Sequence, residues 1–219
     1  MPDHTDLPAP PAFDARFRKS LTDLFRWRRD VRRFRSDPLD AQTVDELLAL
    51  AALAPSVGNS QPWRFVKVKS PALRAEVRSN FAHCNRRALE SYEGERAKLY
   101  ASLKLAGLEI APVQIAVFAD EAPAEGYGLG QATMPETLAY STVMAISAFW
   151  LAARARGIGV GWVSILDPTA VARTLAVPPA WRLIAYLCVG WPEEDHIDPE
   201  LVRAGWQDRL DPQRFVSEK

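Results

Sequence analysis

The densest concentration of charge in this sequence is a run of arginines between positions 26 and 35. Arginine presents a planar fork of donors that matches a phosphate, and it stays charged at every working pH. Several arginines where a helix ends could therefore clamp a phosphate monoester, although a solvated basic face would produce the same run. The run contains a single acid, Asp30, and these arginines: Arg26, Arg28, Arg29, Arg32, Arg33 and Arg35.

Asp30 gives the arginine run a second chemical possibility. A carboxylate among arginines is expected to stay ionised, because nearby positive charge favours its charged form. An ionised carboxylate accepts protons and orients hydrogen-bond donors. Asp30 is therefore a candidate general base.

Two further segments have patterns that suit ligand binding. The loop 54–63, Ala-Pro-Ser-Val-Gly-Asn-Ser-Gln-Pro-Trp, gathers hydroxyls, amides and backbone N–H groups that could satisfy the polar edges of a heterocycle. The segment 157–165 alternates glycines, which permit close backbone approach, and brings Ser164 to the end of a strand. Each also has a purely structural explanation, as a turn in the first case and as helix–strand packing in the second.

Composition and charge exclude several classes of function. The 219 residues contain 27 Lys+Arg and 27 Asp+Glu, so the formal net charge is zero, which argues against a nucleic-acid binder that works by bulk charge. The longest apolar run, 143–153, is shorter than the roughly 20 residues of a membrane span. The acidic, proline-rich start is unlike a signal peptide. We expect a cytoplasmic protein with no membrane partner.

Cysteine and histidine are too sparse to indicate a metal site. Cys84 and Cys188 lie far apart in the sequence, which predicts two free thiols rather than a disulfide framework. The three histidines form no cluster of ligands. Metal catalysis and Cys/His nucleophilic catalysis are therefore not supported.

Hydrophobic periodicity and breakers predict a single α+β domain over residues 13–219, after a loose arm at residues 1–12. Helices are predicted over 13–27, 41–54, 71–109, 135–156 and 168–175, the fourth buried on most of its circumference. Strands are predicted over 63–69, 113–118, 160–164 and 183–189, and the last segment, 195–219, is predicted to pack as an arm. No strand leads into a Gly-x-Gly-x-x-Gly or Walker-type loop, so a doubly wound nucleotide site is not indicated.

Taken together, the arginine segment, the loop 54–63 and the glycine-rich segment 157–165 resemble the FMN-dependent nitroreductase superfamily, in the same order and at similar separations. The resemblance spans nearly the whole chain. Asp30 within Arg-Arg-Asp-Val-Arg, Ser102-Leu103-Lys-Leu-x-Gly, Tyr-Ser-Thr-Val at 140–143 and the end of segment 157–165 are similar to the branch of 5,6-dimethylbenzimidazole synthases. Asp30 and Ser164 are the most specific of these matches.

The resemblance implies a fold and an assembly. It implies a nitroreductase-like fold, with a central and mostly antiparallel sheet flanked by helices. It also implies a homodimer with exchanged arms that binds FMN at its interface, and a lid over the flavin at residues 91–107.

The resemblance also implies a role for individual residues. Asp30 and Ser164 would be catalytic, with Asp30 at the reacting part of the flavin and Ser164 near flavin N5. The residues expected to bind FMN are Arg28, Arg29, Asp30, Val31, Arg32, Ser56, Asn59, Ser102, Leu103, Ser164 and Arg209.

The activity that the resemblance implies is oxygen-dependent fragmentation of reduced FMN to 5,6-dimethylbenzimidazole, the lower ligand of vitamin B12, and erythrose 4-phosphate. A separate NAD(P)H flavin reductase would supply the reduced FMN, in agreement with the missing dinucleotide motif. Two alternatives stay open at this point. One is an NAD(P)H-dependent nitroreductase or flavin reductase, and the other is a flavin-binding protein without turnover.

Overall fold

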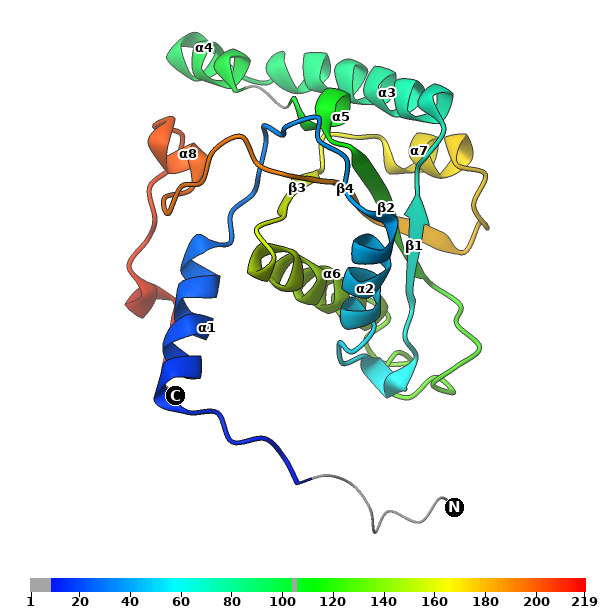
Figure 1. Ribbon diagram of the computed structural model, residues 1–219. Helices are drawn as coiled ribbons and strands as arrows, with labels where there is room; N and C mark the ends of the chain where they lie inside the picture. The colour runs from blue at the N-terminus through cyan, green and yellow to red at the C-terminus, as the bar shows by residue number, and fades with distance from the viewer. Residues whose placement is uncertain (1–8, 104–105) are drawn as a thin grey trace.

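An antiparallel sheet of four strands organises the fold, as the computed structural model of residues 9–103 and 106–219 shows (Figure 1). The strand order is β1-β2-β4-β3, and all three neighbouring pairs are antiparallel. The strands are β1 Trp63–Lys67, β2 Val113–Asp120, β3 Gly159–Val163 and β4 Trp181–Gly190. The expectation of a mostly antiparallel sheet flanked by helices is confirmed.

Helices cover both faces of this sheet. The helices are α1 Ala15–Trp27, α2 Ala41–Ala51, α3 Pro71–Leu89, α4 Gly94–Ser102, α5 Gly107–Ile110, α6 Thr137–Ala155, α7 Pro168–Thr174 and α8 Glu200–Arg203, with 3-10 turns η2 Val57–Asn59 and η3 Pro212–Phe215. Several begin where a side chain accepts a hydrogen bond from an otherwise unpaired N–H group of the first turn. Asp14, Asp40, Ser70 and Asp167 act in this way.

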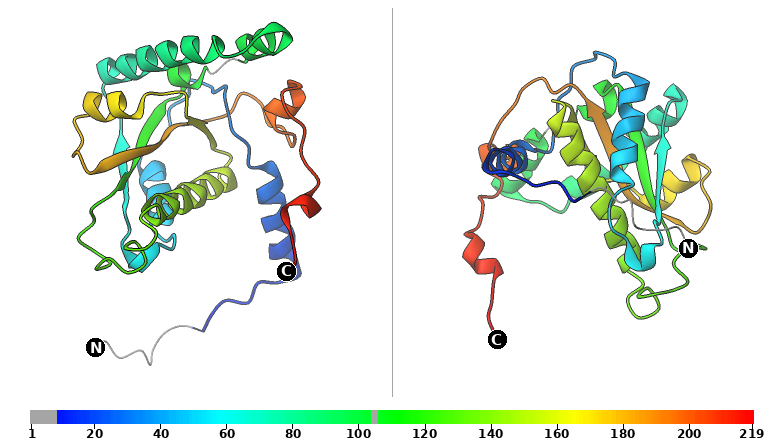
Figure 2. Two further views of the ribbon diagram at one scale, coloured as in Figure 1. Left: turned by 180° about the vertical axis from the view of Figure 1, so that it is seen from behind. Right: turned by 60° about the horizontal axis from the view of Figure 1, so that its bottom comes forward.

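Strand β2 divides the core, because alternate side chains of a strand point to opposite faces of the sheet. Ile115 and Val117 face a cluster built with α2 and α6. Ala116 and Phe118 face a second cluster built with α3, α5 and α7. The two remaining views show the same three layers, with α2 and α6 on one side of the sheet and α3 on the other (Figure 2).

Two expectations, about the third predicted helix and the C-terminal segment, are wrong in detail. The predicted helix 71–109 is broken, because α3 ends at Leu89 and the chain turns before Gly94, whose φ of +57° suits glycine. The C-terminal arm contacts the rest of the chain up to Trp206, but residues 207–219 are exposed, since their sequence offers no apolar stripe to bury.

Helix α6 buries one face rather than most of its circumference. Ile146 and Phe149 are fully buried, while Tyr140, Val143 and Met144 on the other side are exposed. By length and composition alone, this helix of 19 residues could cross a membrane. The sequence indicated no membrane span because only the shorter apolar run 143–153 was considered. Core helices meet the same criterion, and the buried face of α6 packs against α2 and the sheet.

Candidate functional site

The arginine segment is fixed onto the free edge of β3. Asp30 forms a parallel bridge with Val160, and the Val31 N–H donates to the Val160 carbonyl oxygen at 3.0 Å. This approach requires glycine at position 161, because a Cβ atom there would lie 2.1 Å from the Val31 carbonyl oxygen. Phe34 anchors the end of the segment, with its side chain fully buried.

Asp30 is held by contacts to both of its carboxylate oxygens. Oδ1 accepts a hydrogen bond from the Trp162 N–H at 2.8 Å, and Oδ2 lies 3.5 Å from Nε of Arg32. Although 38% of its side-chain surface is exposed, burial raises the pKa of Asp30, while the Trp162 N–H and Arg32 oppose that rise and the Glu200 charge adds to it. A carboxylate with a raised pKa is a better proton acceptor, which fits the role expected of Asp30.

The raised pKa of Asp30 leads to a prediction about stability. The folded state holds this proton more tightly than the unfolded chain, so wild-type stability falls as pH rises from about 4 through the folded pKa. The amide that replaces the carboxyl group in Asp30→Asn does not titrate. We therefore expect this variant to be more stable than wild type at neutral pH, with a difference that vanishes below about pH 4. Urea midpoints measured across pH on the flavin-free protein, with exposed Asp198→Asn as the control, test this. A difference that does not change with pH would contradict it.

Arg28 and Arg29 form a cationic surface beside Asp30. The Arg28 guanidinium stacks 5.0 Å from the ring centroid of Trp150, whose Nε1 donates to the Arg29 carbonyl oxygen at 3.2 Å. Burial lowers the pKa of both arginines, and the charge of Arg209 lowers it further. The charge of Arg209 therefore acts on both, while its role in binding phosphate stays a prediction. Such mutual repulsion of guanidiniums is relieved by a bound anion, so this surface fits a phosphate.

Arg32 adds a second sign of an incomplete site. Its side chain is only 12% exposed. Within the described part of the chain, its buried Nε has no hydrogen-bond partner. Its ion pair with Asp30 Oδ2, at 3.5 Å, is too long for a good hydrogen bond, which fits a position where a ligand supplies a closer acceptor.

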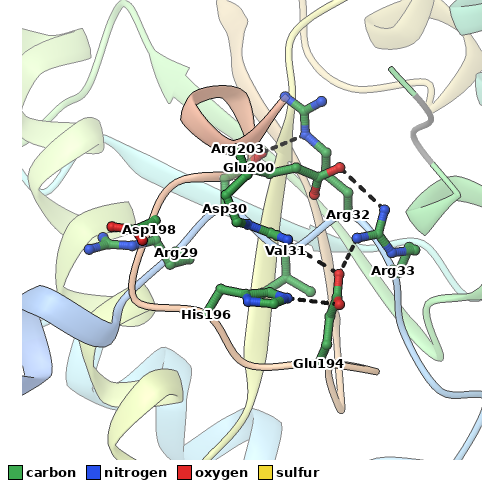
Figure 3. A pocket seen from close by; sticks show the side chains of 10 residues that line it. All are labelled: Arg29, Asp30, Val31, Arg32, Arg33, Glu194, His196, Asp198, Glu200 and Arg203. Carbon is green, nitrogen blue, oxygen red and sulfur yellow. Dashed lines mark hydrogen bonds and ion pairs between the residues drawn. The ribbon is translucent and has the colours of Figure 1, made fainter. Parts of the chain in front are cut away.

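Arg33 serves a structural role that the sequence analysis missed. It lies between Glu194 and Glu200, pairing with Glu194 and, at 3.3 Å, with Glu200, as Figure 3 shows. The Arg29 side chain also donates to the Ile197 carbonyl oxygen at 2.6 Å. Residues 193–200, Glu-Glu-Asp-His-Ile-Asp-Pro-Glu, thus strap the arginine segment from outside. The signal for this contact was present, because a dense acidic run complements a dense basic one.

Ser164 follows β3 directly, two residues beyond the Trp162 N–H that binds Asp30, and it is exposed. The structure therefore brings Ser164 to the same edge of the sheet as Arg28, Arg29, Asp30, Val31 and Arg32. Ser102 and Leu103 lie at the C-terminal end of α4, where the Ser102 hydroxyl donates to the Leu99 carbonyl oxygen at 2.7 Å. They remain candidate binding residues by resemblance alone.

In the folded chain, Ser56 and Asn59 lie away from this group of residues. Their loop is fixed near the start of α6, where Ser141 Oγ accepts from the Val57 N–H at 3.0 Å. The Arg29 carbonyl is fixed at Trp150, which is about 14 Å further along the helix at a rise of about 1.5 Å per residue. Within one chain, the loop that carries Ser56 and Asn59 therefore does not cover the arginine segment.

Comparisons with known proteins agree with this architecture. The model of the nitroreductase family matches residues 25–191. The 5,6-dimethylbenzimidazole synthase of Rhodospirillum rubrum is 60% identical over 199 residues, covering 91% of this chain and 94% of that protein. The protein of the same name from Rhodobacter capsulatus is 54% identical, covering 90% of this chain and 96% of the relative.

Solved structures show the same fold. Iodotyrosine deiodinase bound to FMN and 3-iodo-L-tyrosine superposes with a TM-score of 0.69 at 25% identity, covering 80% of this chain and 91% of that chain. A BluB-like flavoprotein from Clostridium difficile 630 superposes with a TM-score of 0.68 at 21% identity, covering 91% of this chain and 98% of that chain.

Proposed function

We propose, since the chain belongs to the nitroreductase family and within it to the 5,6-dimethylbenzimidazole synthases, that it fragments reduced FMN with O2 to 5,6-dimethylbenzimidazole and erythrose 4-phosphate. The observation that carries this proposal is Asp30 with a raised pKa, bound to the edge of β3 beside arginines whose charges repel one another. That arrangement combines a positioned base with a site for a phosphate.

The residues of this chain divide the work between binding and proton transfer. Reduced FMN supplies the electrons for O2 and is itself the molecule that breaks down. Arg28, Arg29 and Arg209 would hold its phosphate, and Arg32 would donate to its ring edge. Asp30 would take a proton from the reacting part of the flavin. Ser164, at the same sheet edge, would place its hydroxyl near flavin N5.

A lid formed by residues 91–107 completes the proposal. Residues 104–105 of that range lie outside the described structure. The described part contains α4, which carries Ser102, and the start of α5. Gly107 and Leu108 line a small cavity together with Asp30. A closed lid would exclude water from the flavin and strengthen the electrostatic interactions inside the site.

A second copy of the chain would supply the missing wall of the site. The loop that carries Ser56 and Asn59 is bound near the start of α6, whereas the arginine segment is bound at Trp150, further along the same helix. This loop therefore does not cover the arginine segment of its own chain. Helix α1 buries none of its residues, and the exposed face of α6 is apolar. Large apolar surface of this kind marks an interface. A homodimer with exchanged arms would cover both helices and bring Ser56 and Asn59 of one copy to the flavin of the other.

The purified protein is tested by supplying reduced FMN in air and separating the products by chromatography. A benzimidazole peak is the expected result. FMN recovered unchanged after repeated reduction and aeration would instead indicate a flavin carrier. Rapid NADPH oxidation by the FMN-bound protein would indicate a nitroreductase or flavin reductase, the second candidate. We propose that a separate reductase supplies reduced FMN in the cytoplasm, without a metal, membrane or nucleic-acid partner.

Replacement of Ser164 tests the second catalytic assignment. We expect Ser164→Ala to lower the yield of benzimidazole about tenfold, because a single hydrogen bond contributes about 1 to 1.5 kcal/mol. FMN affinity, measured by fluorescence quenching, should change little. Ser36→Ala, at an exposed position of the sequence after the arginine segment, is the control. An unchanged yield in Ser164→Ala would remove this hydroxyl from the reaction.

A further inference from the structure

Helix α4 is too weak to hold its position alone. It has nine residues, begins at a glycine, lacks a side-chain N-cap hydrogen bond and buries none of its residues. Isolated helices shorter than about 12 residues are marginal even for favourable sequences. Contacts from elsewhere must therefore fix α4.

One contact joins α4 to α3, where the Tyr100 hydroxyl donates to Asn85 Oδ1 at 2.8 Å. A second set comes from Trp206, far along the chain. The guanidinium of Arg96 lies 4.6 Å from the centroid of the Trp206 ring, and Arg96 Nη1 donates to the Trp206 carbonyl oxygen at 2.8 Å. Tyr92 meets the same indole edge to face, with the centroids 5.5 Å apart. Tyr92 also stacks on Tyr100 at 4.9 Å. The same indole also lies 6.2 Å from the Tyr100 ring, so it contacts a residue two positions before α4 as well as the first and last turns of that helix.

The segment that carries Trp206 is bound at its other end to the arginine segment. Glu200 pairs with Arg33, and Arg29 donates to the Ile197 carbonyl oxygen. The backbone N–H of Trp206 donates to the Leu201 carbonyl oxygen at 2.8 Å. Because Leu201 belongs to α8, this hydrogen bond links Trp206 directly to that helix. Helix α8 lies beside α4 in Figure 1 and in the reversed view of Figure 2. An unbroken series of contacts thus runs from the neighbours of Asp30 to α4.

We propose that Trp206 is a positioning residue that clamps α4 to the arginine segment and so keeps this helix, the described part of the proposed lid, over the reacting flavin. The clamp itself is a property of this chain, whereas its effect on products rests on the proposed function. With the clamp released, water reaches the site. Reduced FMN then passes two electrons and two protons to O2, which gives oxidised FMN and hydrogen peroxide in place of the benzimidazole.

Hydrogen exchange tests the clamp without any reaction. In the flavin-free protein we expect Trp206→Leu to speed exchange of the α4 amides about tenfold, because an aromatic contact and a cation–π contact are lost together. Trp206→Phe, which keeps a ring for Tyr92, should recover part of the protection. Trp181→Leu is the matched control, since Trp181 also lies beside an arginine, with Arg64 5.8 Å from its ring centroid. Unchanged α4 exchange in Trp206→Leu overturns the proposal.

The product ratio tests the positioning role. Per reduced FMN consumed, we expect Trp206→Leu and Arg96→Ala to give several-fold less benzimidazole and correspondingly more hydrogen peroxide, with FMN affinity nearly unchanged. Faster α4 exchange with an unchanged ratio overturns the role of the clamp in the reaction. If the β2 amides of Trp206→Leu also exchange faster, that variant has a folding defect. The product ratio of the surface variant Arg96→Ala then tests the positioning role. A wild type that makes no benzimidazole refutes the proposed function, while the α4 exchange still decides the clamp.

Discussion

Asp30→Asn is expected to reduce the yield of benzimidazole at least a hundredfold while FMN still binds. Loss of a positioned general base typically costs a factor of about 10² to 10⁴. The asparagine is nearly isosteric, and its Oδ1 can still accept the Trp162 N–H bond, which spans 2.8 Å in the wild type. The arginine segment should therefore stay on β3. Product chromatography after a reduced-FMN incubation, together with an FMN titration, measures both parts of this prediction.

The control for Asp30→Asn is Asp198→Asn. Asp198 lines the same cavity as Asp30 but is exposed, so its replacement removes a negative charge nearby without removing the proposed base (Figure 3). We expect nearly wild-type yield from this control. Comparable losses in the two variants would mean that the site responds to net charge and not to a base at position 30.

Gly161→Ala is expected to have the largest effect on the integrity of the site. A Cβ atom at this position would lie 2.1 Å from the Val31 carbonyl oxygen, and a backbone atom cannot swing aside as a side chain can. The arginine segment would have to leave β3, breaking the bond from the Val31 N–H to Val160. We expect a loss of about 3 kcal/mol or more in the free energy of unfolding, since overpacking a tight contact costs about 1 to 3 kcal/mol and a buried hydrogen bond is lost as well. FMN binding should be lost in parallel.

Gly159→Ala provides the graded comparison for this clash. The three atoms nearest to its added Cβ all belong to the Val31 side chain, the closest at 2.9 Å, and none is a backbone atom. The loss of stability measured by urea denaturation should therefore be clearly smaller than for Gly161→Ala. Equal losses in the two variants would show that the close approach of Val31 to β3 is not what demands glycine at position 161.

Local chemistry made much of the fold predictable from the sequence. Asp40 and Pro55 bracket α2, and Gly157, with a φ of +73°, ends α6 as its position suggested. The break between α3 and α4 was missed because the charged pattern continues through it, although Gly94 was a signal. The exposed face of α6 could not be foreseen either, since an apolar helix surface looks the same whether it packs within a chain or between chains.

The candidate site was predictable only where its residues are neighbours in the sequence. Arg28 to Arg32 form one segment, so their grouping was readable. The bond between Asp30 and the Trp162 N–H joins residues 132 positions apart, and no periodicity encodes such a pairing. Glu200 and Trp206 carried no motif, and only the fold shows that they face Arg33 and Arg96.

The bridge between Asp30 and Val160 also sets the order in which the site can be made. Strand β3 pairs with β4 alone among the strands described, and β4 ends at Gly190. The edge that receives Asp30 therefore exists only after the chain has been synthesised through Gly190. Contacts of such long sequence separation are slow to form, because loop closure precedes any gain from them. The arginine segment thus has no strand edge to pair with until the last strand is in place.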